Sequence, residues 1–84
     1  MSISTTARVP VAPAFSPARL AEARRAAGLR QREVAAAVRR DIRHYQRIES
    51  GHVSPTAALL GVLAMILAVR IDDLFELPEV GTDT

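Results

Sequence analysis

Four polar side chains between residues 43 and 47 are of the types that read DNA bases. Arg43, His44, Gln46 and Arg47 lie off the apolar positions of a segment with helical periodicity. Arg43 and Arg47 are four residues apart and project from one helical face, where each could fork onto O6 and N7 of a guanine. Ile42 beside them could pack on a thymine methyl group. The alternative is that these arginines only neutralise phosphate or lie in solvent.

A helix, a tight turn and a second helix are expected to position these side chains. Apolar residues recur at helical spacing in two runs, first Val34, Ala35 and Val38, then Ile42, Tyr45 and Ile48. Residues 39–41 between the runs are too few for anything but a turn. The Asp41 carboxylate can accept a backbone N–H bond and so start the second helix. The pattern predicts that a recognition helix at about residues 42–50 binds double-stranded DNA.

The composition favours one small domain of packed helices. The chain has 84 residues, of which 49% are hydrophobic but only three are aromatic, and Ala and Leu dominate instead. Its charges are sorted along the sequence. Residues 1–50 carry ten arginines against four acidic residues, whereas residues 51–84 carry one arginine against five acidic residues. A basic half of the chain suits a partner that bears phosphate.

The same composition argues against an enzyme and against a cofactor or metal site. The sequence has no cysteine, no glycine loop able to cradle a phosphate, and no carboxylate–histidine constellation. His44 and His52, eight residues apart, make a poor ligand set for a metal. The sequence shows no apolar secretory signal, and its 13-residue apolar segment 57–69 is too short to span a bilayer. We therefore expect a cytoplasmic, nucleoid-associated protein with no membrane partner.

Capping residues mark the expected helix limits. Ser16-Pro17 supplies a hydroxyl cap and a first-turn proline for a helix that Gly28 ends, and Ser54-Pro55-Thr56 opens a later helix. The expected helices are 17–27, the two that flank the turn, 56–68, and a short one at 72–77. These limits predict an all-α fold, a compact five-helix bundle. Residues 1–16 would form a flexible N-terminal arm, 17–77 the DNA-binding domain, and 78–84 a flexible C-terminal tail.

Residues typical of one known family run through segment 20–75 in a single register. They are Leu20, Arg24, Gly28-Leu29, Gln31, Glu33, Ala35, Val38, Arg47-Ile48-Glu49, Gly51, Pro55, Leu63-Ala64, Leu67, Val69 and Asp72-Asp73-Leu74-Phe75. On these residues the segment resembles the Cro/phage-repressor (Xre-like) helix-turn-helix family. The resemblance implies a bundle of the phage-repressor DNA-binding type, with the helix-turn-helix formed by the second and third helices.

The resemblance also implies which residues contact DNA. Gln31, at the start of the second helix, matches a position that holds a phosphate or reaches an outer base. Three positions of the recognition helix usually meet base edges, and residues just after that helix tend to touch the DNA backbone. The implied contacts are Gln31; Ile42, Arg43 and Arg47 at base edges, with His44 and Gln46 beside them; and Ser50, His52 and Ser54 at the backbone.

Further expectations concern the inside of the fold. Arg24 and Glu49 match a pair that ties the first helix to the third through a buried ion bridge, so their role would be structural. Arg39 stands where the family usually has a left-handed glycine, and Arg40 where an apolar residue packs beneath the turn. A side chain at the left-handed position costs about 1 kcal/mol or more, which favours a rebuilt turn. Tyr45 replaces an aliphatic core residue, and its hydroxyl needs a partner or water.

The fourth expected helix is apolar all round, since no charge occurs from residue 56 to residue 69. Family members usually have polar residues at its outer positions, which here are Ala58, Leu59, Val62, Met65 and Ile66. A helix of this kind must be covered on both sides. We expect a two-fold homodimer formed largely by this helix, helped by Leu77 and Val80, with two recognition helices about 34 Å apart on a palindromic site. Two alternatives are a folded-back N-terminal arm, carrying Val9, Val11 and Phe15, and a different partner protein.

The sequence thus favours a transcriptional regulator, most simply a repressor that binds a palindromic operator as a homodimer. One alternative is an antitoxin or accessory protein whose apolar fourth helix binds another protein. Another is an interaction module that has kept the fold without DNA binding, although the excess of arginine over acidic residues in 1–50 argues against it.

Overall fold

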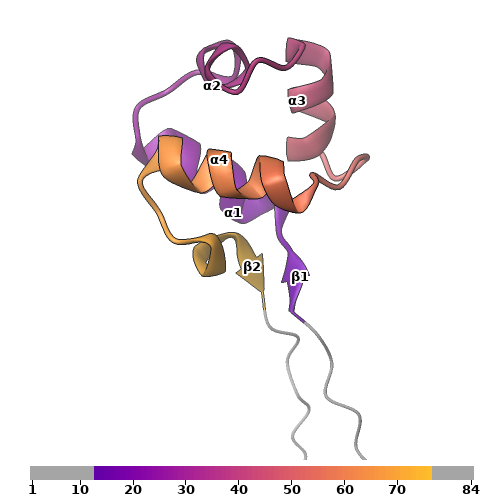
Figure 1. Cartoon of the computed structure of the whole chain (residues 1–84), viewed down its shortest axis with the longest axis vertical. Coiled ribbons are helices and arrows are strands. Elements are labelled where there is room, and N and C mark those ends of the chain that lie inside the picture. The colour runs from indigo at the N-terminus through magenta and orange to yellow at the C-terminus, as the bar shows by residue number, and fades with distance from the viewer. Residues whose placement is uncertain (1–12, 77–84) are drawn as a thin grey trace, which may run out of the picture.

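The computed structural model describes residues 13–76, in which four α-helices enclose one apolar core (Figure 1). Their bounds are α1 (Pro17–Ala26), α2 (Gln31–Ala37), α3 (Ile42–Glu49) and α4 (Ala57–Leu67). A short 3₁₀ helix, η2 (Ile71–Leu74), follows α4. The expected fifth α-helix at 72–77 is therefore wrong. Only this single turn forms, because the backbone becomes extended at Phe75, with φ −116° and ψ 152°.

A two-stranded antiparallel sheet, which we did not expect, closes the end of the domain opposite α2 and α3 (Figure 1). Strand β1 (Ala14–Phe15) pairs with β2 (Phe75–Glu76), so that Phe15 lies opposite Phe75 with the two rings edge to face at 6.3 Å. Residues 14–16, which the sequence analysis placed in the N-terminal arm, thus belong to the folded domain. Residues 1–12 of the arm, with Val9 and Val11, and the expected C-terminal tail, with Val80, lie outside the described residues, as does Leu77.

Side-chain caps begin three of the helices where the sequence indicated. The side-chain oxygens of Ser16, Asp41 and Thr56 each accept a backbone N–H bond from the first turn that follows, at 3.1, 3.0 and 3.1 Å. Gly28 and Gly51, just beyond α1 and α3, take left-handed φ values of 73° and 86°. The caps hold α3 as a separate helix, directly after the turn that follows α2.

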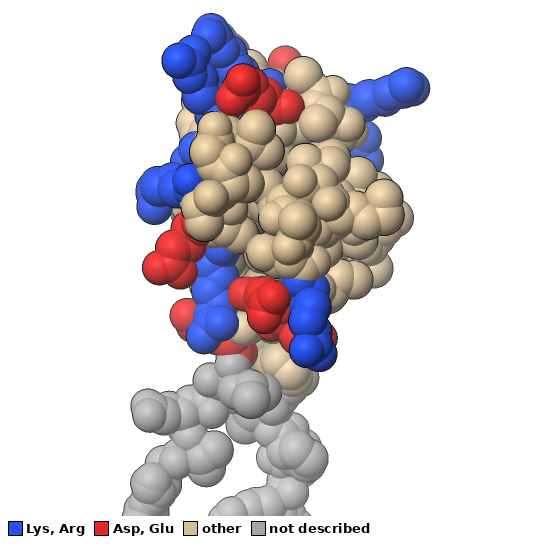
Figure 2. All heavy atoms as spheres, turned by 90° about the vertical axis from the view of Figure 1, so that its left-hand side faces the viewer, with Lys and Arg blue, Asp and Glu red and all other residues tan. Residues whose placement is uncertain are grey.

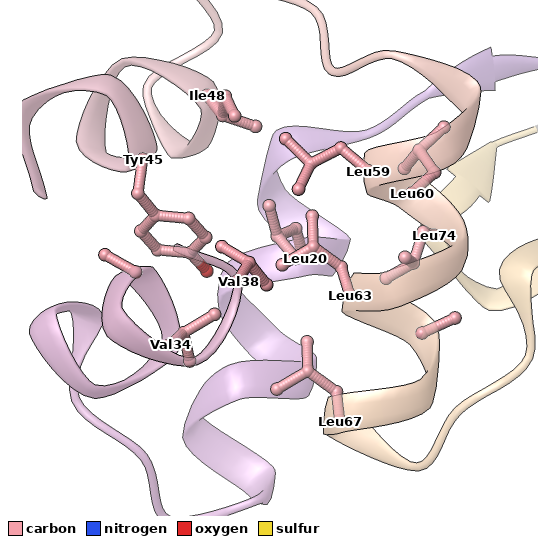
Figure 3. Close-up of a cluster of buried hydrophobic side chains, with 12 residues drawn as sticks. Leu20, Val34, Val38, Tyr45, Ile48, Leu59, Leu60, Leu63, Leu67 and Leu74 are labelled. Carbon is pink, nitrogen blue, oxygen red and sulfur yellow. The ribbon is translucent and has the colours of Figure 1, made fainter. Parts of the chain in front are cut away.

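The core gathers leucines of α4 against side chains of the other three α-helices and of η2 (Figure 3). Its large members are Leu20, Val34, Val38, Tyr45, Ile48, Leu59, Leu60, Leu63, Leu67 and Leu74. The Tyr45 ring points from α3 toward Val34 and Val38, and none of Tyr45 is exposed (Figure 3). Burial of Tyr45 and Ile48 fixes one face of α3 against the protein and leaves the opposite face exposed to solvent.

One of the five residues expected on the outer face of α4 faces inward. Leu59 is only 4% exposed and belongs to the core, so its assignment to a dimer interface was wrong. The inner face of α4 is wide because the helix packs on α2 and on η2 at the same time. The exposed stripe consists of Ala58, Val62 and Met65, spaced i, i+4 and i+7, with Ile66 half-buried beside it.

The turn between α2 and α3 keeps the left-handed geometry despite its two arginines. Arg39 has φ 59°, so the expected rebuilding of the turn was wrong. The N–H of Arg40 donates to the carbonyl oxygen of Ala35 at 2.9 Å, which closes the turn. The Arg40 side chain is exposed rather than packed beneath the turn, with its guanidinium 3.4 Å from the carbonyl oxygen of Val38.

Replacing Arg39 with glycine is expected to stabilise the protein by about 0.5–1 kcal/mol, because glycine adopts a left-handed φ without the strain of a β-carbon. Urea unfolding monitored by circular dichroism measures the change. Arg39→Ala removes the same charge but keeps the β-carbon, and should bring no comparable gain. Ala68, at φ 57°, offers a test that involves no charge, since Ala68→Gly should stabilise by a similar amount. Equal stability of the glycine and alanine variants at position 39 would contradict the strain.

Candidate nucleic-acid interface

The exposed face of α3 carries a compact set of polar side chains. Arg43, Gln46, Arg47 and Ser50 share one face at spacing i, i+3, i+4 and i+7, and all four are exposed. With His52 from the segment after α3, they line one shallow depression. Tyr45 and Ile48 occupy the opposite face of the helix and are fully buried. The core therefore aims this polar face away from the protein.

The other predicted contact residues lie around the depression rather than in it. Ile42 and His44 are half-buried and flank the polar face, and Ile42 also packs against the core. Gln31 comes from the start of α2 and is half-buried. Its side-chain oxygen Oε1 accepts a 3.2 Å hydrogen bond from the side-chain nitrogen Nε2 of Gln46, so α2 and α3 are joined at this surface.

Hydrogen bonds hold the residues that follow α3. The Ser50 hydroxyl donates to the carbonyl oxygen of Arg47 at 3.1 Å and lies 2.7 Å from Nδ1 of His52. The hydroxyl and the imidazole nitrogen thus share one hydrogen bond directly beside the end of α3. This arrangement presents the imidazole next to the arginines of α3.

A bidentate ion pair connects α1 to the end of α3. Nε of Arg24 lies 2.6 Å from Oε2 of Glu49, Nη2 lies 3.2 Å from Oε1, and the two side chains are 11% and 6% exposed. Nη1 of Arg24 also donates to the carbonyl oxygen of Leu29 at 2.9 Å. The pair thus fixes α3 against α1 and against the loop that leads into α2.

Two more donors reach the Glu49 carboxylate. The Tyr45 hydroxyl donates to Oε2 at 2.5 Å, and the Gln31 amide nitrogen donates to Oε1 at 2.9 Å. Burial by itself raises the pKa of Glu49, but the hydrogen bonds from Arg24, Tyr45 and Gln31 outweigh it, so the pKa lies below its ordinary value. Burial and the neighbouring carboxylate raise the pKa of Tyr45, which keeps its hydroxyl a donor. At neutral pH Glu49 is therefore an ionised, fully hydrogen-bonded acceptor.

Comparison with family models decides the family. A model of the helix-turn-helix domain matches residues 18–78, well over half of the chain. The chain belongs to the helix-turn-helix domain family. The match confirms the resemblance to the Cro/phage-repressor type, and a domain of this family indicates a DNA-binding regulator. Neither the search of curated proteins nor the search of solved structures returned a match.

In this helix-turn-helix protein, sequence analysis missed the role of Gln31 inside the fold. Gln31 precedes Glu49 by 18 residues, and no local spacing signals their hydrogen bond. The bond between Tyr45 and Glu49 spans four residues of one helix, so it could have been found from helical geometry. The contact through Gln31 exists only because α2 packs against α3.

The charges of the helix-turn-helix protein are also distributed unevenly in space. Arginine side chains extend from the end that carries α2 and α3, with acidic groups beside them, and charges of both signs also lie near η2 and β2, with a broad uncharged area between the two ends (Figures 1 and 2). Within residues 13–76, no helix is long and apolar enough to cross a membrane. The same described residues include no group of three or more His, Cys, Asp or Glu that could hold a metal ion.

Proposed function

We propose that this helix-turn-helix protein is a sequence-specific regulator of transcription, most simply a repressor, that reads duplex DNA with α3. The observation that supports this function best is the polar depression on the exposed face of α3, lined by Arg43, Gln46, Arg47, Ser50 and His52. These side-chain types pair with base edges and phosphates in the major groove. A helix fixed on its other face by the core and by the Arg24–Glu49 ion pair presents them in a constant geometry.

The contacts divide by chemistry. Arg43 and Arg47 are placed to fork onto guanines, and Ile42, at the edge of the same face, to meet a thymine methyl group. Ser50 and His52 follow the helix and would hold phosphates, as would His44 on its flank. Phosphate contacts set the register of the protein on the duplex, and base contacts choose the sequence.

The homodimer that this proposal includes would use the exposed apolar stripe of α4. Val62 is 40% exposed and Met65 77% exposed, with Ala58 and the half-buried Ile66 beside them. Figure 2 shows a broad uncharged area on the side where the C-terminal end of α4 and the segment after it lie, and Ile71 in that segment is 45% exposed. Pairing this surface with a second copy would remove it from water. It would also relate two α3 helices by a two-fold axis, as a palindromic operator requires.

The substitution Val62→Glu is expected to give monomers with weaker operator binding, because each interface would bury two like carboxylates close to the axis. Sedimentation velocity and operator titration, each over a range of protein concentration, measure the two effects. Ala18→Glu adds the same charge at an exposed position of α1 and should leave both unchanged. A dimer that persists in Val62→Glu would place the interface elsewhere. The apolar stripe would then be left for a different protein, as in an antitoxin or accessory protein.

Selection of random duplexes by the purified protein tests the proposed function. An enriched palindrome with half-sites about one helical turn apart would support a dimeric, sequence-reading regulator. Affinity for the selected duplex should fall by roughly 0.9 log unit per log unit of salt for each phosphate contacted. A folded protein that enriches no sequence would refute DNA reading and turn attention to α4 as the functional surface.

A further inference from the structure

Three side chains form a directional chain of hydrogen bonds from the interior to the surface of α3. Glu49 accepts at Oε1 from the amide nitrogen of Gln31 at 2.9 Å, and the amide oxygen of Gln31 accepts from the amide nitrogen of Gln46 at 3.2 Å. Glu49 is nearly buried, Gln31 is half-buried, and Gln46 is exposed in the polar depression of α3. These two hydrogen bonds therefore connect the buried carboxylate of Glu49 to the surface that is proposed to contact DNA.

The direction of this chain is set by its inner end. An ionised carboxylate can only accept, so Gln31 must turn its NH₂ group toward Glu49 and its carbonyl oxygen toward Gln46. That oxygen can only accept in turn, so Gln46 must turn its own NH₂ group toward Gln31. Without the inner carboxylate, either amide could rotate by half a turn at little energetic difference. Arg24 and Tyr45 keep Glu49 in place by two further sets of hydrogen bonds.

The bonded Gln46 amide keeps a defined set of polar groups for DNA. One of its two N–H groups is used by Gln31, which leaves the carbonyl oxygen and one N–H. Adenine offers a complementary pair in the major groove, with a donor at N6 and an acceptor at N7. Guanine offers two acceptors, which the carbonyl oxygen of Gln46 cannot match.

We propose that Gln31 is a positioning residue that fixes the amide polarity of Gln46, and that Gln46 thereby selects adenine at one position of each half-site. This inference rests on the proposed DNA-reading function of α3. It assigns Gln31 a role beyond the phosphate contact that the family resemblance implied, because the amide oxygen of Gln31 accepts from Gln46 and one of its two amide N–H groups donates to Glu49.

Two substitutions of Gln31 by side chains of similar length test whether its amide orients Gln46 or only contacts DNA. Gln31→Met has neither donor nor acceptor at the amide position. Gln31→Lys can donate to Glu49 but cannot accept, so Gln46 would turn its carbonyl oxygen toward the lysine and its NH₂ group toward DNA. Gln46→Ala removes the proposed reader itself. Each variant is compared with the wild type by circular dichroism and thermal unfolding, so that only folded proteins enter the binding comparison.

The measurement is the affinity of each protein for a set of duplexes that carry all four bases in turn at every position of the selected site. The wild type should prefer adenine at one half-site position by a factor of roughly 5 to 150. That preference should be lost in Gln46→Ala and in Gln31→Met. A variant that carries both substitutions should lose no more of the adenine preference than either single variant, because the two residues act through one contact. In Gln31→Lys the preference at that position should pass from adenine to guanine, while the preferences at all other positions stay.

The outcomes that contradict this inference differ from those that contradict the proposed function. If Gln31 only holds a phosphate, Gln31→Met should weaken binding to all duplexes alike and lower the salt slope by about one unit, with the adenine preference retained. That outcome overturns the inference and leaves the proposed function standing. Retention of adenine preference in Gln46→Ala or in Gln31→Lys would overturn it as well. A wild-type protein without any base preference would refute the proposed function, and this inference with it.

Discussion

The Arg24→Ala variant is expected to lose roughly 3–5 kcal/mol of its free energy of unfolding, because it leaves the Glu49 carboxylate buried without its cation. A domain of this size has a total stability of only about 4–13 kcal/mol, so the variant should be largely unfolded in moderate urea. The loss also includes the hydrogen bond from Arg24 to the carbonyl oxygen of Leu29. Urea unfolding followed by circular dichroism measures the change.

Arg25 provides a matched control, since it is the next residue of the same helix and is exposed. Arg25→Ala should change the stability by no more than about 0.5 kcal/mol. Replacing both partners, as in Arg24→Met with Glu49→Leu, removes the two buried charges together and should cost less than Arg24→Ala alone. Equal stability of Arg24→Ala and Arg25→Ala would show that the ion pair does not hold α1 to α3.

The same carboxylate gives the stability a pH dependence of known sign. The pKa of Glu49 is lowered in the folded protein relative to its ordinary value of 4.5, despite the opposing effect of burial. Its contribution is therefore fully present above about pH 4.5 and is lost as the pH falls through the lower folded-state pKa. Melting temperatures of the wild type and of Glu49→Gln should approach each other as the pH falls through this range. The exposed Glu22→Gln variant should instead follow the wild type closely.

Arg43→Ala and Arg47→Ala should each reduce the preference for the selected duplex over random duplex by about 1–3 kcal/mol, the discrimination expected of one bidentate contact to guanine. The fold should stay intact, because both side chains are exposed and neither guanidinium donates a hydrogen bond within the described part of the chain. Competition titrations with selected and random duplexes measure the preference, and thermal unfolding checks the fold.

Arg70→Ala removes the same charge from the far end of the domain, just before η2 (Figure 1). Its side chain is 80% exposed, so this variant reports only the effect of net charge. Arg70→Ala should lower the affinity for the selected duplex and for the random duplex slightly, and by the same factor. If Arg43→Ala and Arg47→Ala behaved as Arg70→Ala does, the two arginines would be phosphate contacts and base reading would fall to other residues.

The sequence by itself determined the helices that surround the candidate site and the face that α3 exposes. Ser16, Asp41 and Thr56 cap helices locally, and local hydrogen bonds of this kind need no knowledge of the rest of the fold. The buried positions Tyr45 and Ile48 followed from helical periodicity, which also assigned Arg43 and Arg47 to the opposite face.

The sequence predictions that were wrong depended on how helices and strands pack against one another. Residues 75–76 pair as a strand with residues 14–15, and a short pairing between distant segments leaves little trace in the sequence of either one. Leu59 turned inward because α4 touches two elements at once, which widens its buried face beyond a simple amphipathic stripe. Arg39 kept the left-handed turn because a strain of about 1 kcal/mol is small beside the packing of α2 on α3.

Only the tertiary structure decided the hydrogen bonds that connect the interior of the domain to the exposed face of α3. Gln31, Gln46 and Glu49 are each ordinary polar residues in the sequence, and their order of donation appears only when α2 and α3 are packed together. Helical limits arise from interactions within a few residues and can be read from the chain. The orientation of an amide group depends on atoms 15 and 18 residues away, and those are brought near by burial of the common core.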